Sequence, residues 1–156
     1  MTATTLSVEV EGADEVALAL RRIGADVHDL KPVMSDVGDY LKDFFAGEVF
    51  ASRGGVIGHP WARLSPVYAA QKARKYAGRG VLVATGEMQR SFISNAAPMQ
   101  VEITNTARHF VYHQSDAARR ILPYRPMMDV RSGDTRYDRI VEMLVAHVAK
   151  AIKENT

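Results

Sequence analysis

The 156-residue chain contains no cysteine, which excludes disulfides, thiolate metal ligands, iron–sulfur clusters and cysteine nucleophiles. No apolar run approaches the ~18–20 residues that a membrane-spanning helix requires. The sequence Met-Thr-Ala-Thr-Thr-Leu at the start lacks the basic and apolar regions of a signal peptide. From these absences we expect a soluble, cytoplasmic product with no membrane segment.

Motifs for common catalytic chemistry are also missing. The chain has neither the Gly-x-Ser-x-Gly of a hydrolase nor the Gly-x-x-x-x-Gly-Lys of a phosphate-binding loop. His109 and His113 have the four-residue spacing of helical zinc ligands, but Phe110 stands where a zinc protease has its glutamate. We therefore expect no enzyme, no cofactor and no metal, with a metal-dependent enzyme using this histidine pair as an alternative.

What the chain does have is the composition of a globular protein, with 47% hydrophobic and 24% charged residues, and we predict a single domain over residues 1–156. Its charge is unevenly distributed. Residues 1–50 carry ten acids and four bases, whereas residues 51–125 carry three acids and eleven bases. Such a division fits a role in solubility alone, and it equally fits a phosphate-binding face or subunits that stack an acidic side against a basic side in a ring.

Hydrophobic periodicity predicts an α+β fold. Its clearest element is a helix over residues 30–52, in which apolar residues recur at i, i+3, i+4 and i+7. Residues 53–64 contain three glycines and a proline, so we expect a loop without regular structure. We predict a small mixed or antiparallel sheet of about four strands, with long helices packed on one face and a long C-terminal helix. The predicted strands are 5–11, 91–97, 99–105 and 125–130, and the other predicted helices are 14–24, 65–76, 87–90, 107–114 and 134–154.

The basic segment 63–79 interleaves cations with aromatic side chains. Arg63, Lys72 and Lys75 lie close in sequence to Trp61 and Tyr68. Such a mixture suits single-stranded nucleic acid, through base stacking and phosphate contacts. A nucleic-acid-binding module that uses segment 63–79 is therefore an alternative function, and buried aromatic anchors with solvated lysines outside them are the structural alternative.

Three sequence blocks resemble motifs of the phage virion morphogenesis or tail completion proteins, the family that includes tail completion proteins of P2-like and Mu-like phages. The blocks occur in the order expected of that family. They are Gly58-His59-Pro60-Trp61-Ala62-Arg63-Leu64-Ser65 with Lys72 downstream, then Leu82-Val83-Ala84-Thr85-Gly86-Glu87-Met88-Gln89-Arg90-Ser91, and finally Tyr112-His113-Gln114 followed by Leu122-Pro123-Tyr124-Arg125-Pro126-Met127-Met128.

The blocks also have a physical interpretation of their own. Gly86 permits a backbone angle that other residues resist. Pro123 and Pro126 bracket Arg125 on an extended segment, where it suits a bidentate pair with a carboxylate on a neighbouring element or subunit. Trp61 in a glycine-rich loop is typical of an interface anchor. Intramolecular packing is the alternative for both Trp61 and Arg125.

The resemblance implies a structural phage protein of the head–tail junction or the top of the tail, either a tail completion or terminator protein or a neck component. By the same resemblance it forms a homo-oligomeric, hexameric ring that contacts the tail tube protein and head-completion or connector proteins, with DNA passing through the lumen without specific contacts. Its expected location is the virion, and the host cytoplasm during assembly. The candidate interface and motif residues are Trp61, Leu64, Lys72, Thr85, Gly86, Arg119, Arg120, Pro123, Arg125 and Pro126.

A cyclic ring requires one surface patch to meet a different patch on the next copy. We hypothesise that the acidic face of the helix over residues 30–52 meets either the basic segment 63–79 or the arginines 119, 120 and 125 of a neighbouring copy.

Overall fold

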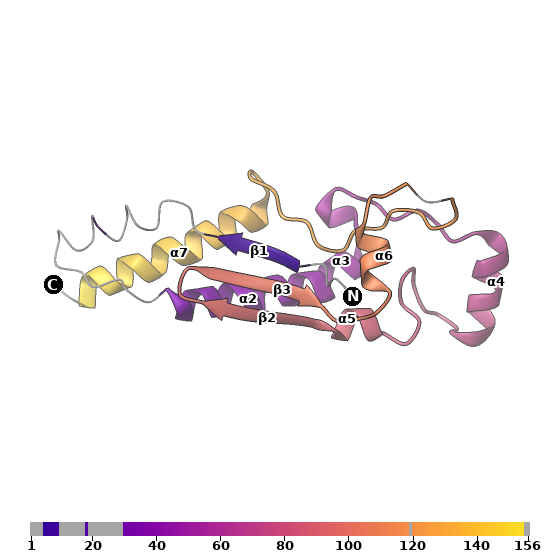
Figure 1. The fold of residues 1–156 in the computed structure, drawn as a ribbon, viewed down its shortest axis with the longest axis horizontal. Helices are drawn as coiled ribbons and strands as arrows, with labels where there is room; N and C mark the ends of the chain where they lie inside the picture. Colours follow the sequence, from indigo (N-terminus) through magenta and orange to yellow (C-terminus); the bar gives the residue numbers. More distant parts are fainter. Residues whose placement is uncertain (1–4, 10–17, 19–29, 119, 155–156) are drawn as a thin grey trace. The chain divides into compact units, whose positions relative to one another are not determined.

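A computed structural model describes residues 5–9, 18, 30–118 and 120–154, and it shows an α+β fold (Figure 1). The predicted fold class is confirmed, whereas the predicted helix over residues 14–24 lies, apart from residue 18, outside the described residues. The elements are β1 (Thr5–Glu9), α2 (Lys31–Ala46), α3 (Glu48–Ala51), the 3₁₀ turn η1 (Gly55–Ile57), α4 (Pro66–Lys75), α5 (Glu87–Arg90), β2 (Phe92–Ala97), β3 (Gln100–Asn105), α6 (Phe110–Gln114) and α7 (Thr135–Glu154).

Within the described residues the sheet is antiparallel and has three strands in the order β1-β3-β2, one strand fewer than predicted. The chain divides into two compact units. Unit 1 comprises Met1–Leu6, Lys42–Ile93 and Thr104–Asp129, and unit 2 comprises Ser7–Leu41, Ser94–Ile103 and Val130–Thr156. The single-domain organisation stays a prediction.

The apolar stripe predicted for residues 30–52 is buried as expected. The prediction of one continuous helix is wrong, because the helix is interrupted at Gly47, which separates α2 from α3. Gly47 adopts φ −102° and ψ −80°, outside the helical range, although its N–H still donates to Asp43 O at 2.9 Å. Glycine is a weak helix former, so the chain bends there at small cost. The buried members of the stripe are Leu30, Val33, Met34, Val37, Leu41, Phe44, Phe45 and Val49.

In unit 2, α2 packs directly against the hairpin formed by β2 and β3. A Cβ atom placed on Gly38 would lie 2.8 Å from Val101 Cγ2 and 3.0 Å from Ser94 Cβ, so the helix approaches the strands closely because this residue has no side chain. Val101 and Ile103 are fully buried, which confirms the alternation predicted for the second strand of the hairpin. The hairpin turn occupies positions 98 and 99.

The long helix α7 lies close to its predicted bounds and is covered along only part of its apolar stripe. Ile140 is buried, whereas Tyr137, Val141 and Val145 are 43%, 41% and 61% exposed. These three residues are spaced four apart and form their own column on the helix surface, one position removed from the buried column. None of the described helices is both long and apolar enough to cross a membrane.

Candidate functional site

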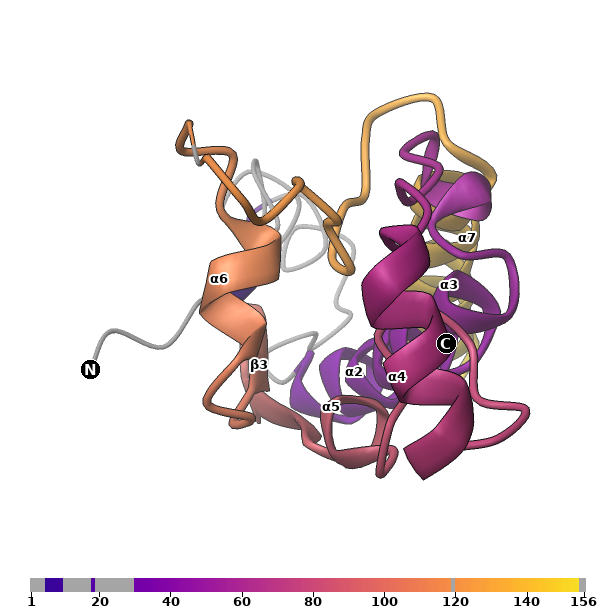
Figure 2. The same ribbon diagram turned by 90° about the vertical axis from the view of Figure 1, so that its right-hand side faces the viewer.

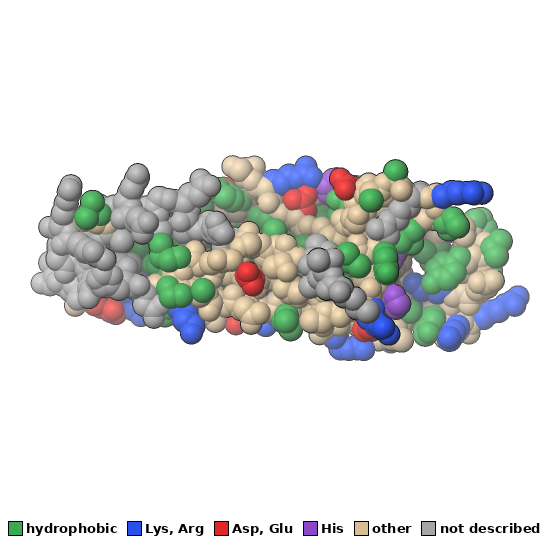
Figure 3. All heavy atoms as spheres, viewed as in Figure 1, with side chains coloured by type: hydrophobic (Ala, Val, Ile, Leu, Met, Phe, Trp, Pro, Cys, Tyr) green, Lys and Arg blue, Asp and Glu red, His purple; other side chains and the backbone are tan. Residues whose placement is uncertain are grey.

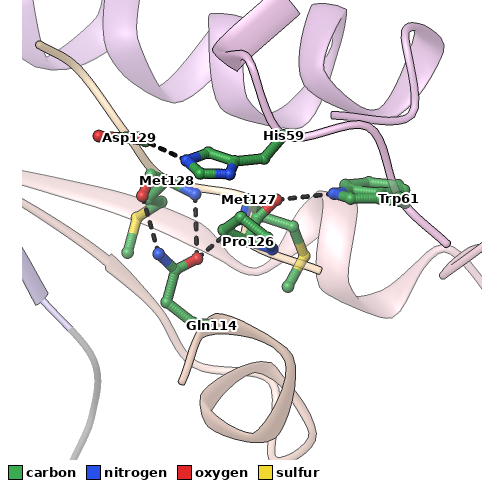
Figure 4. Close-up of polar contacts among 7 residues, drawn as sticks. All are labelled: His59, Trp61, Gln114, Pro126, Met127, Met128 and Asp129. Atoms are coloured by element: carbon green, nitrogen blue, oxygen red, sulfur yellow. Dashed lines mark hydrogen bonds and ion pairs between the residues drawn. The ribbon is translucent and has the colours of Figure 1, made fainter. Parts of the chain in front are cut away.

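Residues 125–128 are buried in unit 1, but the segment over residues 125–130 is not the strand that the sequence predicts. Side chains take the place of a neighbouring strand. Gln114 Oε1 accepts hydrogen bonds from the main-chain N–H groups of Met127 at 2.8 Å and Met128 at 3.0 Å, and Gln114 Nε2 donates to Met128 O at 2.8 Å (Figure 4). Pro126 has no N–H to offer to a strand ladder. The prediction fails because an extended apolar segment has the same alternating pattern whether a strand or side chains satisfy its backbone.

Trp61 fixes the other side of the same segment. Its Nε1 donates to Pro126 O at 2.7 Å (Figure 4). Its ring packs edge-on against Phe50 at a centroid distance of 5.2 Å. With only 6% of its surface exposed, Trp61 anchors the interior of unit 1 and is not an exposed interface residue. Of the two interpretations the sequence left open, intramolecular packing holds for this residue.

The loop that carries Trp61 is more regular than predicted. It contains the 3₁₀ turn η1, with glycines at positive φ on both sides, Gly54 at 77° and Gly58 at 74°. Gly54 N–H donates to Val49 O at 2.8 Å, and Trp61 N–H donates to Arg53 O at 2.7 Å, which closes the loop on itself. Where the loop meets the buried segment, His59 Nε2 lies 3.3 Å from Asp129 Oδ2 (Figure 4).

Arg125 is 5% exposed and binds main-chain carbonyl oxygens. Its Nε donates to Ala62 O at 2.9 Å and its Nη2 donates to Arg63 O at 3.2 Å, so the described contacts differ from the carboxylate pair that the sequence suggested. Burial lowers the pKa of the guanidinium. Within its own subunit the Arg125 side chain is therefore held by main-chain carbonyls, and its contact with a neighbouring copy stays a prediction.

Lys72 lies on α4, a helix that begins as predicted with Ser65 as its N-cap and Pro66 in its first turn. The side chain is 6% exposed, and its Nζ donates to Gly80 O at 2.5 Å. Burial, followed by the nearby positive charge of Arg125, lowers the pKa of Lys72.

Thr85 and Gly86 form a local turn that starts α5. Gly86 adopts φ 81°, which confirms the backbone angle proposed for it. Thr85 Oγ1 accepts from Glu87 N–H at 3.3 Å, and Arg90 Nη2 donates to Thr85 O at 2.9 Å. These contacts give both residues a role in the turn.

A pocket of about 1020 Å³ lies within unit 1, and it brings four of the predicted residues together: Leu64, Lys72, Pro123 and Arg125. We call it the α4 pocket, because four residues of α4 line it, together with His113 of α6 and the preceding His109. Figure 2 shows the ribbons of α4 and α6. Among the described residues no group of three His, Cys, Asp or Glu side chains is placed to hold a metal ion. Trp61 and Pro126 lie in the interior packing, Arg120 is exposed outside the pocket, and Arg119 lies outside the described residues.

A sequence model of the phage virion morphogenesis family matches residues 12–149. The chain belongs to the phage virion morphogenesis family. This confirms the resemblance drawn from the three blocks, and no curated protein and no solved structure matches the chain. The protein therefore has a role in phage virion assembly, in a family of structural and assembly proteins.

In this phage virion morphogenesis protein the first and third blocks form one packing arrangement. The first block supplies Trp61 and the carbonyls of residues 62 and 63, and the third block supplies their partners at Pro126 and Arg125. Gln114 holds the remaining backbone groups of the third block. Gln114 belongs to the third block but is not among the candidate interface and motif residues, because a glutamine has no chemistry that marks it before its partners are known.

The buried lysine of this phage virion morphogenesis protein gives a pH-dependent prediction. The folded state lowers the pKa of Lys72 from 10.5, so between the lowered pKa and pH 10.5 the unfolded chain binds more protons and stability rises with pH. Lys72→Met removes this pH-dependent contribution to the free energy of unfolding. We expect the stability of the wild-type protein, relative to Lys72→Met, to increase as pH rises from neutral toward 10.5.

Urea unfolding at several pH values checks the prediction. Lys75→Met, at an exposed position on the same helix, is the control for the loss of one lysine. If the difference in the free energy of unfolding between wild type and Lys72→Met stays constant with pH, the prediction is contradicted.

Proposed function

We propose that this protein is a structural component of the head–tail junction or of the top of the tail, and that it forms a hexameric ring that joins the tail tube to the head. The observation that carries the proposal is the family membership. The ring contacts the tail tube protein and head-completion or connector proteins, DNA passes through its lumen, and the mature protein is part of the virion.

Exposed charges of opposite sign support a ring built from one repeated contact. On α2, Asp36 and Asp43 are exposed and lie seven residues apart on one helix face. On and after α4, Arg74, Lys75 and Arg79 are exposed. A heterologous interface, in which the acidic patch of one copy meets the basic patch of the next, closes into a ring when the rotation is right.

Charge reversal tests the interface. Asp36→Lys with Asp43→Lys, and separately Arg74→Glu with Arg79→Glu, are expected to prevent self-assembly, because like charges then face each other. Combining all four substitutions in one chain restores opposite charges and is expected to restore the ring. Mass photometry and negative-stain electron microscopy at low and high salt measure the outcome.

The control reverses two acids elsewhere, Asp138→Lys with Glu142→Lys on α7, and should leave assembly unchanged. Arg119 and Arg120, which follow α6 in the sequence, are the other basic candidates, so Arg119→Glu with Arg120→Glu tests whether these two arginines carry the contact instead. A wild-type protein that stays monomeric at every concentration and salt would overturn the ring.

Binding of nucleic acid through residues 63–79 is the second candidate function. Exposed Arg63 and Lys75, together with Tyr68 at 51% exposure, favour it. Burial removes Trp61 from the stacking platform that the sequence suggested. Affinity for single-stranded DNA that falls steeply with salt, in a monomeric protein, would support this function.

A further inference from the structure

We propose that the α4 pocket binds an extended peptide segment of another protein, in which carboxylate side chains stand beside bulky apolar side chains. This goes beyond ring formation and does not depend on it, because all the residues that line the pocket come from unit 1 of one copy.

The charges around the α4 pocket are of one sign. Among the described residues that line it there are four lysines or arginines and two histidines, and no aspartate or glutamate. A concave site lined by one sign of charge focuses the electrostatic potential and attracts groups of the opposite sign. Lys72 and Arg125 already donate to main-chain carbonyls, so Arg63 and Lys75, which are both exposed, are the cations best placed to bind a ligand carboxylate.

Apart from Ser65 and Gln71, the rest of the pocket wall is apolar, and part of it is left open to solvent. Leucines 64, 82 and 122 and Met88 line the pocket, and so does Ile121, whose side chain is 91% exposed. On the face that Figure 3 shows, hydrophobic side chains alternate with lysines and arginines around a hollow near α4. Exposed apolar groups that gather at a concave site are typical of a binding surface.

Size and chemistry favour a peptide over other anions. A volume of about 1020 Å³ reaches the upper end of small-molecule pockets, which span ~300–1,000 Å³, so several peptide residues fit. An isolated phosphate would leave the apolar wall without a partner. Nucleic acid needs open aromatic faces for stacking. Of the two tyrosines that line the pocket, Tyr68 is 51% exposed, whereas Lys75 Nζ lies 5.3 Å from the centre of the Tyr76 ring, so one open tyrosine stands beside a larger number of aliphatic side chains.

A different protein fits better than a second copy of this chain. The acidic face of α2 offers Asp36 and Asp43, but the apolar side chains of the same helix, such as Val37 and Leu41, are fully buried. That face therefore brings carboxylates without the apolar groups that the pocket wall requires. A flexible segment of another virion protein can carry both.

The test is a selection from a random dodecapeptide library displayed on ribosomes, with the full-length protein as bait. We expect enriched peptides that combine Asp or Glu with Leu, Ile or Phe. Synthetic copies of these peptides, measured by fluorescence anisotropy, should bind about tenfold more weakly to Ile121→Ser and to Arg63→Glu, two pocket residues outside the basic patch of the ring interface. The matched controls Val67→Ser and Arg74→Glu change exposed residues of α4 that do not line the pocket, and they should leave the affinity within about twofold.

The proposal is overturned if no peptide is enriched, if enriched peptides lack carboxylates, or if the controls weaken binding as much as the pocket variants do. A thymidine 12-mer that binds more tightly than the peptides and is lost in the same variants would assign the pocket to nucleic acid, and tight binding of a peptide with the sequence of residues 31–46 would assign it to a second copy. Arg74→Glu also separates this proposal from the ring, since it belongs to the ring interface and not to the pocket.

Discussion

Replacing Gly54 with alanine is expected to destabilise unit 1 by about 2–5 kcal/mol. Gly54 has φ 77°, a left-handed conformation that costs an L-residue roughly 1–2 kcal/mol. The added Cβ would also collide with His59 O and lie 2.5 Å from Trp61 Nε1, and such overpacking adds about 1–3 kcal/mol. The Nε1 atom cannot move away freely, because it donates to Pro126 O. Urea unfolding, followed by the fluorescence of the chain's single tryptophan, measures the loss.

Gly58→Ala is the matched control for this prediction. Gly58 has nearly the same φ, 74°, but a Cβ atom there has nothing within 4 Å. The Gly58→Ala variant should therefore lose only the roughly 1–2 kcal/mol of stability that a left-handed backbone conformation costs an L-residue. Equal losses for the two variants would show that the contact between residue 54 and Trp61 does not constrain the loop.

Replacing Gln114 with leucine is expected to cost about 3–6 kcal/mol. The side chain is the hydrogen-bond partner of three main-chain groups, the N–H of Met127 and both the N–H and C=O of Met128 (Figure 4). Met127 and Met128 are buried, so each group that loses its partner costs roughly 1–3 kcal/mol. The fluorescence of Trp61 should change as well, because its own partner Pro126 belongs to the same segment.

Two controls separate hydrogen bonding from shape. Gln71→Leu makes the same exchange on the exposed surface of α4 and should change stability by less than about 0.5 kcal/mol. Gln114→Glu keeps an acceptor for the two N–H groups but loses the donor to Met128 O, so its loss should be intermediate. A loss of less than about 1 kcal/mol for Gln114→Leu would mean that water replaces the amide and that the segment is not held as described.

Helices were predictable wherever one face of the chain had to be buried. The stripe from Leu30 to Val49 repeats with the period of a helix, and all eight of its predicted members are buried. Ser65 with Pro66 and Gly86 marked the starts of α4 and α5, because capping and positive φ are local properties of the chain. The interruption at Gly47 was not predicted, since a glycine is also tolerated inside a helix.

The sequence predicted which residues belong to the candidate site better than it predicted the contacts that these residues make. The motif blocks contain Trp61 and Arg125, but their partners are main-chain carbonyls more than 60 residues away in sequence. The same holds for Gln114, whose role exists only because the segment with Met127 and Met128 lies beside it.

The sequence by itself therefore determined the helix and strand patterns, the local turns and the family, since each of these depends on residue order and spacing within short stretches. Only the tertiary structure decided that Lys72 and Arg125 are enclosed, that side chains replace a fourth strand, and that basic and apolar groups meet in one pocket. The physical reason is that a hydrogen bond, a desolvated charge or a cavity depends on which distant groups are neighbours, and folding rather than chain order sets those neighbours.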